Sequence, residues 1–413
     1  MVREMKDSGI EWIGEIGFDF YMMKLKYVSI ILDQFRKPVT ADQRSQEGEM
    51  LYDYYGASGA IDKINGYTID DHVMLIGEDG ANLKMRNLPL MYEVNGKAWI
   101  NNHAHILKPK QGIDFYYLFY VLEAIDINPY ITGSAQPKLS QENLKNIWIP
   151  VPNVNIQKEI VCCIKDACIG LDNILEKTRS SIEEYKKLKQ SVITKAVTKG
   201  VRGNREMKDS QSMWFGQIPD DWNMRKMKYI FKIQKYIAGE EGHTVLSITQ
   251  KGIKPKDLSK NEGQLAESYS NYQLVHIGDF AMNHMDLLTG WVDVSKYEGV
   301  TSPDYRVFGL IDKDNYCSQY YLYLMQMCYT NRIFYGLGQG VSGLGRWRLQ
   351  ADKFLNFSIT VPSYEEQQEI ANYLDKKCSA IDELIAKKEQ YLSEIENYKK
   401  SLIYEYVTGK KEV

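Results

Sequence analysis

Two glycine-containing polar loops carry residue types that could recognise hydrogen-bonding groups on another molecule. The first loop lies in Thr132–Pro152 and the second in Gly336–Pro362. Each combines serine and glutamine with lysine or arginine. Arginine can donate two hydrogen bonds to guanine, a side-chain amide can pair with adenine, and an ammonium group can contact phosphate. The loops therefore predict contacts with base edges and phosphates, although a solvated loop with incidental basic residues would look the same.

The two loops differ where they should be equivalent. Alignment on Leu139 and Leu349 brings Gln136 opposite Arg346. Because an amide and a guanidinium prefer different bases, the two loops should recognise different sequences. The candidate nucleic-acid contacts are Ser134, Gln136, Lys138, Asn101, Asn102, Asn283, Ser342, Arg346, Trp347 and Arg348.

Motifs for methyl transfer and for DNA translocation are missing. An amino-methyltransferase needs a motif of the Asn or Asp-Pro-Pro-Tyr type, and Asn128–Tyr130 is one proline short and follows a helical pattern. Gly336, Gly338 and Gly340 form a GxGxG string, which is a weak signal and also follows a helical pattern. No GxxxxGK[ST] phosphate loop occurs. The chain is therefore predicted not to be an enzyme.

Neither the histidines nor the cysteines are spaced like metal ligands. His103 and His105 stand two positions apart, with no carboxylate or cysteine set at zinc spacing. They are expected to be strand-end residues. The six cysteines lack regular spacing, and the adjacent Cys162 and Cys163 fall in a helical pattern. Such cysteines indicate reduced thiols in a reducing compartment, and no metal site is predicted.

The composition fits a soluble, cytoplasmic chain of two or three domains. Of 413 residues, 44% are hydrophobic and 25% are charged. No apolar run approaches the roughly 18 residues of a membrane span, and the N-terminus lacks the pattern of a signal peptide. A net charge of −3 argues against broad coating of nucleic acid. Any such contact must be local or supplied by a partner.

A long helix predicted over Asn155–Gly200 must position the loops. Its apolar residues recur in steps of four and three, the heptad pattern of a helix that faces a partner helix. A helix of about 44 residues is roughly 66 Å long, which exceeds what a globular domain requires. The predicted seam of this helix consists of Ile160, Ile164, Leu171, Ile174, Tyr185 and Leu188.

The partner helix is predicted in the same chain, over Glu365–Lys410. An offset of 210 residues, as from Gln157 to Gln367, aligns matching proline, glutamine and aspartate residues, so two unrelated amphipathic helices are a poor alternative. Its seam consists of Ile370, Leu374, Ile381, Leu384, Tyr391 and Tyr398. We expect an intramolecular antiparallel coiled coil, weakened where Lys377 and Lys388 fall on the seam.

The globular regions repeat as well. The segment MKDSGIEWIGEIGFDFYMMKLKYV from Met5 recurs as MKDSQSMWFGQIPDDWNMRKMKYI from Met207, an offset of 202 residues. Internal repetition of this kind fixes the architecture before secondary structure does. The chain is therefore two copies of one plan, a globular domain followed by a long helix.

Each globular region is predicted to be α+β. Short apolar segments in Tyr67–Leu107, separated by Gly, Asn and Asp, indicate strands, and Asn95–Gly96 is the best hairpin signal. Aromatic-rich helices are predicted over Ile113–Ile125 and Ser318–Tyr329. The predicted fold is α+β: two similar globular domains separated by two long helices in an antiparallel coiled coil, with a pseudo-two-fold internal repeat.

Several segments together resemble the specificity subunit of type I restriction-modification systems. They are SGIEWIGEI, MKLKYV, LKNIWIPVP followed by QKEI, YKKLKQSVITKAVTKG, VSKYEGVTSPDYRVF and VPSYEEQQEI. The similarity covers nearly the whole chain. It implies two target-recognition domains, residues 1–153 and 204–362, each reading one half of a split, asymmetric site in double-stranded DNA. The helices, in residues 154–203 and 363–413, would set the separation and hold partner subunits.

The same resemblance implies which partners and cofactors to expect. Two methyltransferase subunits and the restriction or motor subunits would carry the chemistry, with N6 methylation of a flipped adenine as the expected modification. S-adenosylmethionine would be bound by the methyltransferase, and ATP and Mg by the nuclease, with no cofactor on this chain. The alternatives are a single-chain restriction-modification enzyme and a scaffold that binds only proteins.

Overall fold

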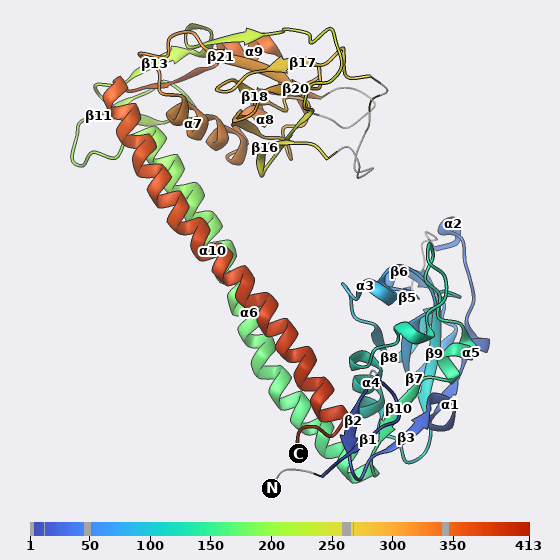
Figure 1. Cartoon of the computed structure of the whole chain (residues 1–413). Helices are drawn as coiled ribbons and strands as arrows, with labels where there is room; N and C mark the ends of the chain where they lie inside the picture. The colour runs from blue at the N-terminus through green and yellow to red at the C-terminus, as the bar shows by residue number, and fades with distance from the viewer. Residues whose placement is uncertain (1–3, 12, 45–50, 258–265, 267, 341–346) are drawn as a thin grey trace. The chain divides into compact units, whose positions relative to one another are not determined.

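The computed structural model describes residues 4–11, 13–44, 51–257, 266, 268–340 and 347–413 (Figure 1). Its contacts divide the chain into two compact units. The first comprises Met1–Arg179 with Gln390–Val413, and the second comprises Ser180–Glu389. Each unit therefore contains one globular region and parts of both long helices.

Strands dominate the first globular region. A six-stranded sheet has the order β4-β9-β7-β8-β5-β6. The strands of this unit are β1 (Met5–Asp7), β2 (Glu15–Gly17), β3 (Tyr21–Lys24), β4 (Ser29–Ile31), β5 (Leu51–Gly56), β6 (Gly59–Asn65), β7 (Ile69–Gly77), β8 (Met91–Ile100), β9 (Ala104–Pro109) and β10 (Trp148–Val151). Its shorter helices are α1 (Leu25–Val28), η1 (Asp33–Phe35), α2 (Ala41–Arg44), α3 (Asn82–Met85), α4 (Phe115–Ala124), η2 (Asn128–Tyr130) and α5 (Gln141–Lys145).

The central strand β7 is apolar on both faces because both faces are covered. Met74 and Ile76 pack into one buried cluster, which also contains residues of α4, while Val73 and Leu75 pack into another. Alternating side chains of a strand point to opposite faces, so four consecutive apolar residues serve two cores.

The second globular region contains a four-stranded sheet in the order β14-β21-β18-β19. Its strands are β11 (Met207–Asp209), β12 (Gln217–Pro219), β13 (Asn223–Lys226), β14 (Phe231–Gln234), β15 (Leu246–Thr249), β16 (Gly252–Pro255), β17 (Gln273–Val275), β18 (Phe280–Met282), β19 (Val292–Val294), β20 (Gly299–Thr301), β21 (Arg306–Leu310), β22 (Gln339–Gly340), β23 (Trp347–Arg348) and β24 (Ser358–Val361). Its shorter helices are η3 (Met227–Tyr229), α7 (Ser318–Thr330), α8 (Ile333–Leu337) and α9 (Ala351–Asn356).

The predicted α+β repeat is confirmed in the order of three strands. In the first unit β9 lies between β4 and β7, and in the second unit β21 lies between β14 and β18. The predicted aromatic helices also form, as α4 and α7.

The Asn95–Gly96 hairpin prediction is wrong. Strand β8 passes through this dipeptide without interruption and pairs with β7 along its length. The buried apolar residues Val94, Ala98 and Ile100 continue on both sides of the dipeptide, which favours one long strand over a turn. The chain instead reverses at residues 101–103, between β8 and β9.

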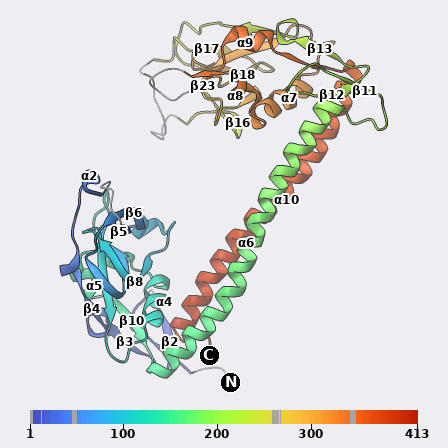
Figure 2. The same ribbon diagram turned by 180° about the vertical axis from the view of Figure 1, so that it is seen from behind.

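Two long helices, α6 (Val154–Lys199) and α10 (Tyr364–Val407), run side by side in opposite directions in Figures 1 and 2. Neither contains a proline, and the single glycine of α6, Gly170, costs about 1 kcal/mol in a helix interior. A 46-residue helix therefore forms without a break, as the heptad pattern predicts.

Repeat-related ion pairs join these helices within each unit. In the first unit Lys399 donates to Asp172 at 2.6 Å, and in the second Lys189 donates to Asp382 at 2.6 Å. Each residue of one pair is the 210-residue equivalent of a residue in the other. All four side chains are partly exposed, so each pair stabilises the fold by less than about 1 kcal/mol and mainly favours this alignment of the helices.

The predicted seam is correct for one row of residues and wrong for the other. Ile164, Leu374 and Ile381 are buried, and Leu171 and Tyr185 are half-buried. Ile160 and Ile370 are also buried, and the core clusters of the globular regions include them together with Ile164 and Leu374. The remaining members, 41–55% exposed, are Ile174, Leu188, Leu384, Tyr391 and Tyr398.

The second row lies one residue further along each helix. Cys168, Leu175 and Ile182 are buried in α6, as is Cys378 in α10. The row that contains Ile164 is common to the predicted and the observed seam. The second row of a heptad can lie either three or four residues after the first. Burial follows the spacing of four, which also removes Lys377 from the seam.

A buried glutamine fixes the start of each long helix to its globular region. The side-chain oxygen of Gln157 accepts the backbone N–H of Asp114, the residue before α4, at 2.8 Å. The side-chain oxygen of Gln367 accepts the backbone N–H of Cys317, the residue before α7, also at 2.8 Å. Each glutamine also donates to the carbonyl of the proline that follows the last strand.

A buried tyrosine contacts the other end of each long helix. Tyr117 of the first unit donates its hydroxyl to the carbonyl of Val407, at the end of α10. The hydroxyl of Tyr320 in the second unit lies 3.4 Å from the carbonyl of Val197, near the end of α6. Each unit therefore uses the start of one long helix and the end of the other.

No helix in the described ranges is long and apolar enough to cross a membrane. Within the same ranges, no group of three or more His, Cys, Asp or Glu residues is arranged to hold a metal ion.

Candidate nucleic-acid interface

The first polar loop is a closed turn with exposed side chains. The backbone of Thr132 and that of Lys138 exchange two hydrogen bonds of 2.8 and 2.9 Å, which close the loop. Gly133 has φ 82°, and a side chain there would collide with the Gln136 carbonyl. Ser134, Gln136 and Lys138 are exposed, so the structure places these three predicted contacts on one accessible loop.

A charge-balanced polar cluster lies beside this loop. Lys138 pairs with Glu78 at 3.2 Å, and Glu78 also binds Arg36. His105 contacts Asp33 at 2.7 Å through Nδ1 and the carbonyl of Leu139 at 2.8 Å through Nε2. The cluster contains two carboxylates and two permanent cations.

Both carboxylates of this cluster are held in the ionised form. Burial raises the pKa of Asp33, but hydrogen bonds from His105, Ile106 and Gln141 outweigh it and lower the pKa below the ordinary value. Burial likewise raises the pKa of Glu78, but hydrogen bonds from Arg36 and Lys138 outweigh it and lower the pKa below the ordinary value. The loop of the first unit therefore lies beside a cluster in which the cations form ion pairs with carboxylates of the protein.

The asparagines are poorer candidates than predicted. Asn101 is buried, and its side-chain oxygen accepts the backbone N–H of His103, so it shapes the turn and is unsuitable for a base edge. Asn102 is exposed. In the second unit Asn283 is half-buried and accepts the backbone N–H of Met285 in the same way.

In the second unit β22 and β23 pair as a two-stranded ribbon within the equivalent polar segment. Ser342 and Arg346 lie outside the described residues. Trp347 stacks on Tyr335 with ring centres 5.1 Å apart and donates its indole N–H to the Tyr335 carbonyl at 2.6 Å. Its ring therefore anchors the ribbon, and Arg348 beside it is exposed.

The second unit also contains a cavity of about 620 Å³ next to this ribbon, which the sequence did not reveal. Arg306 and His284 line it and are each 5% exposed. Nη1 of Arg306 and Nδ1 of His284 have no hydrogen-bond partner. Lys235 and Arg348 line the same cavity and are exposed.

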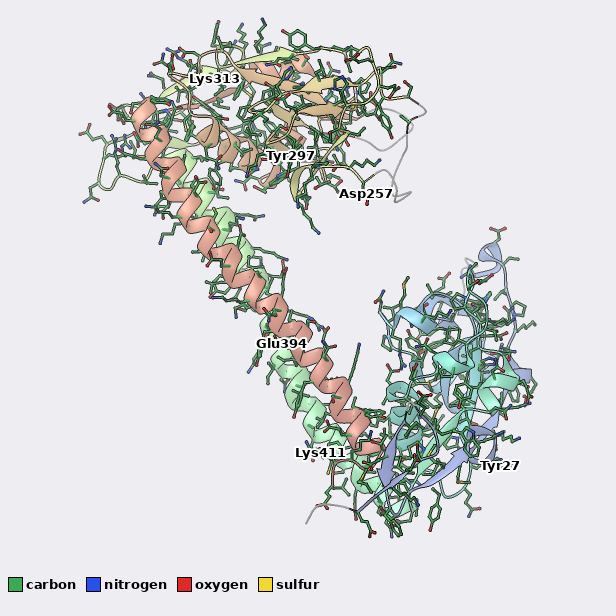
Figure 3. The ribbon with its side chains drawn as sticks, in the orientation of Figure 1. Tyr27, Asp257, Tyr297, Lys313, Glu394 and Lys411 are labelled. Carbon is green, nitrogen blue, oxygen red and sulfur yellow. The ribbon has the colours of Figure 1, made fainter. Side chains whose placement is uncertain are left out.

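One exposed surface feature is the same in both units. Lys26 lies 5.3 Å from the ring centre of Tyr27, and its equivalent Lys228 lies 5.1 Å from that of Tyr229. Both tyrosines are more than half exposed, and Figure 3 shows Tyr27 on the surface of its unit. The two units therefore present the same exposed pair of a lysine and a tyrosine at equivalent positions.

The chain matches a known family over two segments. Residues 19–184 and 219–397 each match the type I restriction modification DNA specificity domain. The two matches fall on the two repeats and together cover most of the chain.

Relatives and a solved structure agree with this match. A putative type I restriction enzyme specificity subunit of Haemophilus influenzae is 31% identical over 38% of this chain and 37% of its own length. A type I restriction enzyme specificity subunit of Methanocaldococcus jannaschii is 28% identical over 72% of this chain and 70% of its own. A chain from a study of assembly and conformational transition of a type I R-M system shares the fold, with TM-score 0.66, 13% identity, and 96% and 99% coverage of the two chains.

Proposed function

Since the chain belongs to the family of type I restriction modification DNA specificity domains, we propose that it selects the DNA sequence on which a methylating and restricting complex acts. One observation carries the proposal. The two units share a fold and a loop position, but the polar groups around the two loops differ. Protein folds of one plan with unlike polar surfaces are suited to reading two unlike sequences.

The DNA site is accordingly proposed to be bipartite and asymmetric. Gln136 and Lys138 would contact one half from the first unit, and Arg346 and Arg348 the other half from the second. An amide favours adenine, and an arginine favours guanine. Phosphate contacts beside these residues would set the register of each unit on the duplex.

The catalytic steps are proposed to belong to other subunits. Two methyltransferase subunits would bind the chain, because the exposed Lys26–Tyr27 pair and its equivalent Lys228–Tyr229 offer the same contact twice. S-adenosylmethionine would be bound by those subunits, and the methyl group would go to N6 of a flipped adenine. Restriction subunits would supply ATP- and Mg-dependent cleavage. Such a complex acts in the cytoplasm, where the DNA is.

Single-molecule sequencing of N6-methyladenine tests the proposal. A host that expresses this chain with its methyltransferase should carry one methylated motif made of two unlike halves. Replacing Gln136 and Lys138 with alanine should relax one half, and replacing Arg346 and Arg348 should relax the other. Each lost bidentate contact removes about 1–3 kcal/mol of discrimination at its base pair.

The two double variants control each other. Both should fold and both should still direct methylation to the half that they leave intact. A continuous or symmetric motif in the wild type would contradict a bipartite reader. Loss of both halves in either folded variant would contradict the assignment of one loop to each half.

A further inference from the structure

The cavity of the second unit lies where the first unit has its charge-balanced cluster, as strand pairing shows. Ile76 pairs with His105 in the first unit, and Met282 pairs with Arg306 in the second. His105 and Arg306 are therefore equivalent. Both contact equivalent carbonyls, because His105 lies 2.8 Å from the Leu139 carbonyl and Arg306 donates to the Leu349 carbonyl at 2.9 Å.

Two positions further along the neighbouring strand, Glu78 of the first unit corresponds to His284 of the second. A backbone hydrogen bond supports this equivalence, because Leu139 donates to the Glu78 carbonyl at 2.8 Å and Leu349 donates to the His284 carbonyl at 3.0 Å. Strand β4 pairs with β9 as β14 pairs with β21, and this register makes Lys235 the equivalent of Asp33. Both carboxylates of the first unit are thus replaced by basic residues.

The cations that remain in the second unit have no anion within the cluster. Arg306 is fixed by its bond to the Leu349 carbonyl and by the ring of Phe354, 4.9 Å from its guanidinium carbon. Burial, with a smaller contribution from the nearby cation Arg348, lowers the pKa of Arg306 to about 10. No ion pair to Arg306, Arg348 or Lys235 occurs among the described residues, and the carboxylate of Asp352, which also lines the cavity, is exposed.

A buried guanidinium with a free N–H and no counterion is unfavourable unless a ligand completes it. We propose that this cavity binds a phosphate group of the DNA backbone, with Nη1 of Arg306 as the buried donor and Arg348 and Lys235 at its opening. Phosphate suits the site because its oxygens accept several charge-assisted hydrogen bonds at once. Free phosphate has the same chemistry as a backbone phosphate. The choice of DNA as the source of the phosphate therefore rests on the proposed function.

The test introduces the missing carboxylate. In the complete chain with its methyltransferase, His284→Glu restores the charge that Glu78 supplies in the first unit. DNA binding should weaken by about tenfold to a hundredfold, as expected for loss of a hydrogen bond between charged groups. The slope of log affinity against log salt should become shallower by about 0.9, the value for one phosphate contact.

Two control variants and a second test variant accompany this experiment. His284→Gln keeps position 284 uncharged and should retain the wild-type salt slope. Met213→Glu adds the same charge at a residue that is 87% exposed and does not line the cavity, and it should also retain the slope. Lys235→Asp supplies the equivalent of Asp33 at an exposed position, so it tests the proposal even if His284→Glu lowers the melting temperature.

Inorganic phosphate distinguishes the two sources of the ligand. Without DNA, phosphate should raise the melting temperature of the wild type more than that of His284→Glu. Phosphate stabilisation with an unchanged DNA salt slope would identify a free-phosphate site and overturn the DNA assignment. A change of methylated motif at an unchanged slope would indicate a base contact and also overturn it. Failure of the wild type to methylate any defined motif would instead contradict the proposed function.

Discussion

The two units place residues of different charge at equivalent positions, as Glu78 and His284 show. Glu78 is ionised because Arg36 and Lys138 bind it. His284 is neutral, because burial lowers its pKa to about 3 and the charges of Arg306 and Arg348 add to that effect. This position therefore contributes, together with that of Asp33 and Lys235, to whether the cations beside each loop are compensated by the protein or remain available to a ligand.

The neutral state of His284 makes the second unit sensitive to acid. The folded pKa is near 3 and the unfolded value near 6.5, so between these pH values only the unfolded chain binds the proton. Stability should therefore fall as the pH is lowered through this range. His284→Gln should remove this contribution, which amounts to about 2 kcal/mol at pH 5.

Urea unfolding at pH 7 and pH 5 in phosphate-free buffer measures this difference. The variant should lose less stability than the wild type between the two pH values. An equal loss in both proteins would show that His284 is protonated in the folded state. Acid sensitivity from Asp33 and Glu78 is common to both proteins and cancels in the comparison, since their lowered pKa values remain unchanged.

At the scale of single elements, the phase of α6 decides which residues stabilise the helix pair. Leu175 is 5% exposed and its neighbour Ile174 is 41% exposed. Leu175→Ala should lower the free energy of unfolding by about 2–5 kcal/mol through the buried surface and the cavity left behind. Ile174→Ala should change it by no more than about 0.5 kcal/mol.

Urea unfolding of the two variants against the wild type tests the corrected seam. The substitutions are adjacent on one helix and remove side chains of equal size, so the two variants differ mainly in the burial of the side chain that is removed. A larger loss for Ile174→Ala would restore the seam predicted from the sequence.

The repeats, the two long helices and the α+β class were predictable because each depends on patterns many residues long. The phase within the heptad was not predictable from the sequence, since Ile160, Ile174 and Leu188 are all apolar but lie in different environments. Ile160 belongs to a globular core, whereas Ile174 and Leu188 are exposed. The Asn95–Gly96 dipeptide misled for a similar reason, because strand pairing across the sheet outweighed a local turn preference.

The candidate site was predictable only where it is a loop. Ser134, Gln136 and Lys138 stand on the predicted surface, since polar loop residues remain exposed. Arg306 and His284 were invisible because their role depends on which strands pair, and a single arginine in an apolar segment carries no such information. Trp347 was assigned to DNA, but its indole N–H is used by the Tyr335 carbonyl.

At the scale of the whole molecule, each unit contains the start of one long helix and the end of the other. The first unit uses residues up to Arg179 and then Gln390–Val413. Tyr117 contacts the end of α10, and Tyr320 contacts the end of α6. Because Val407 and Val197 are equivalent in the repeat, each globular region accepts the same kind of helix end.

The equivalence of the two helix ends has a consequence for a truncated chain that ends after residue 205, as a stop codon there would produce. Helix α6 carries both Asp172 and Lys189, the equivalents of Asp382 and Lys399, so two copies of α6 can form both ion pairs with each other. Tyr117 of one copy would contact Val197 of the second in place of Val407. The truncated product should therefore form a homodimer, and its methylated motif should be palindromic. Sedimentation equilibrium measures the mass of the truncated product, and the mass of a monomer would contradict the predicted homodimer.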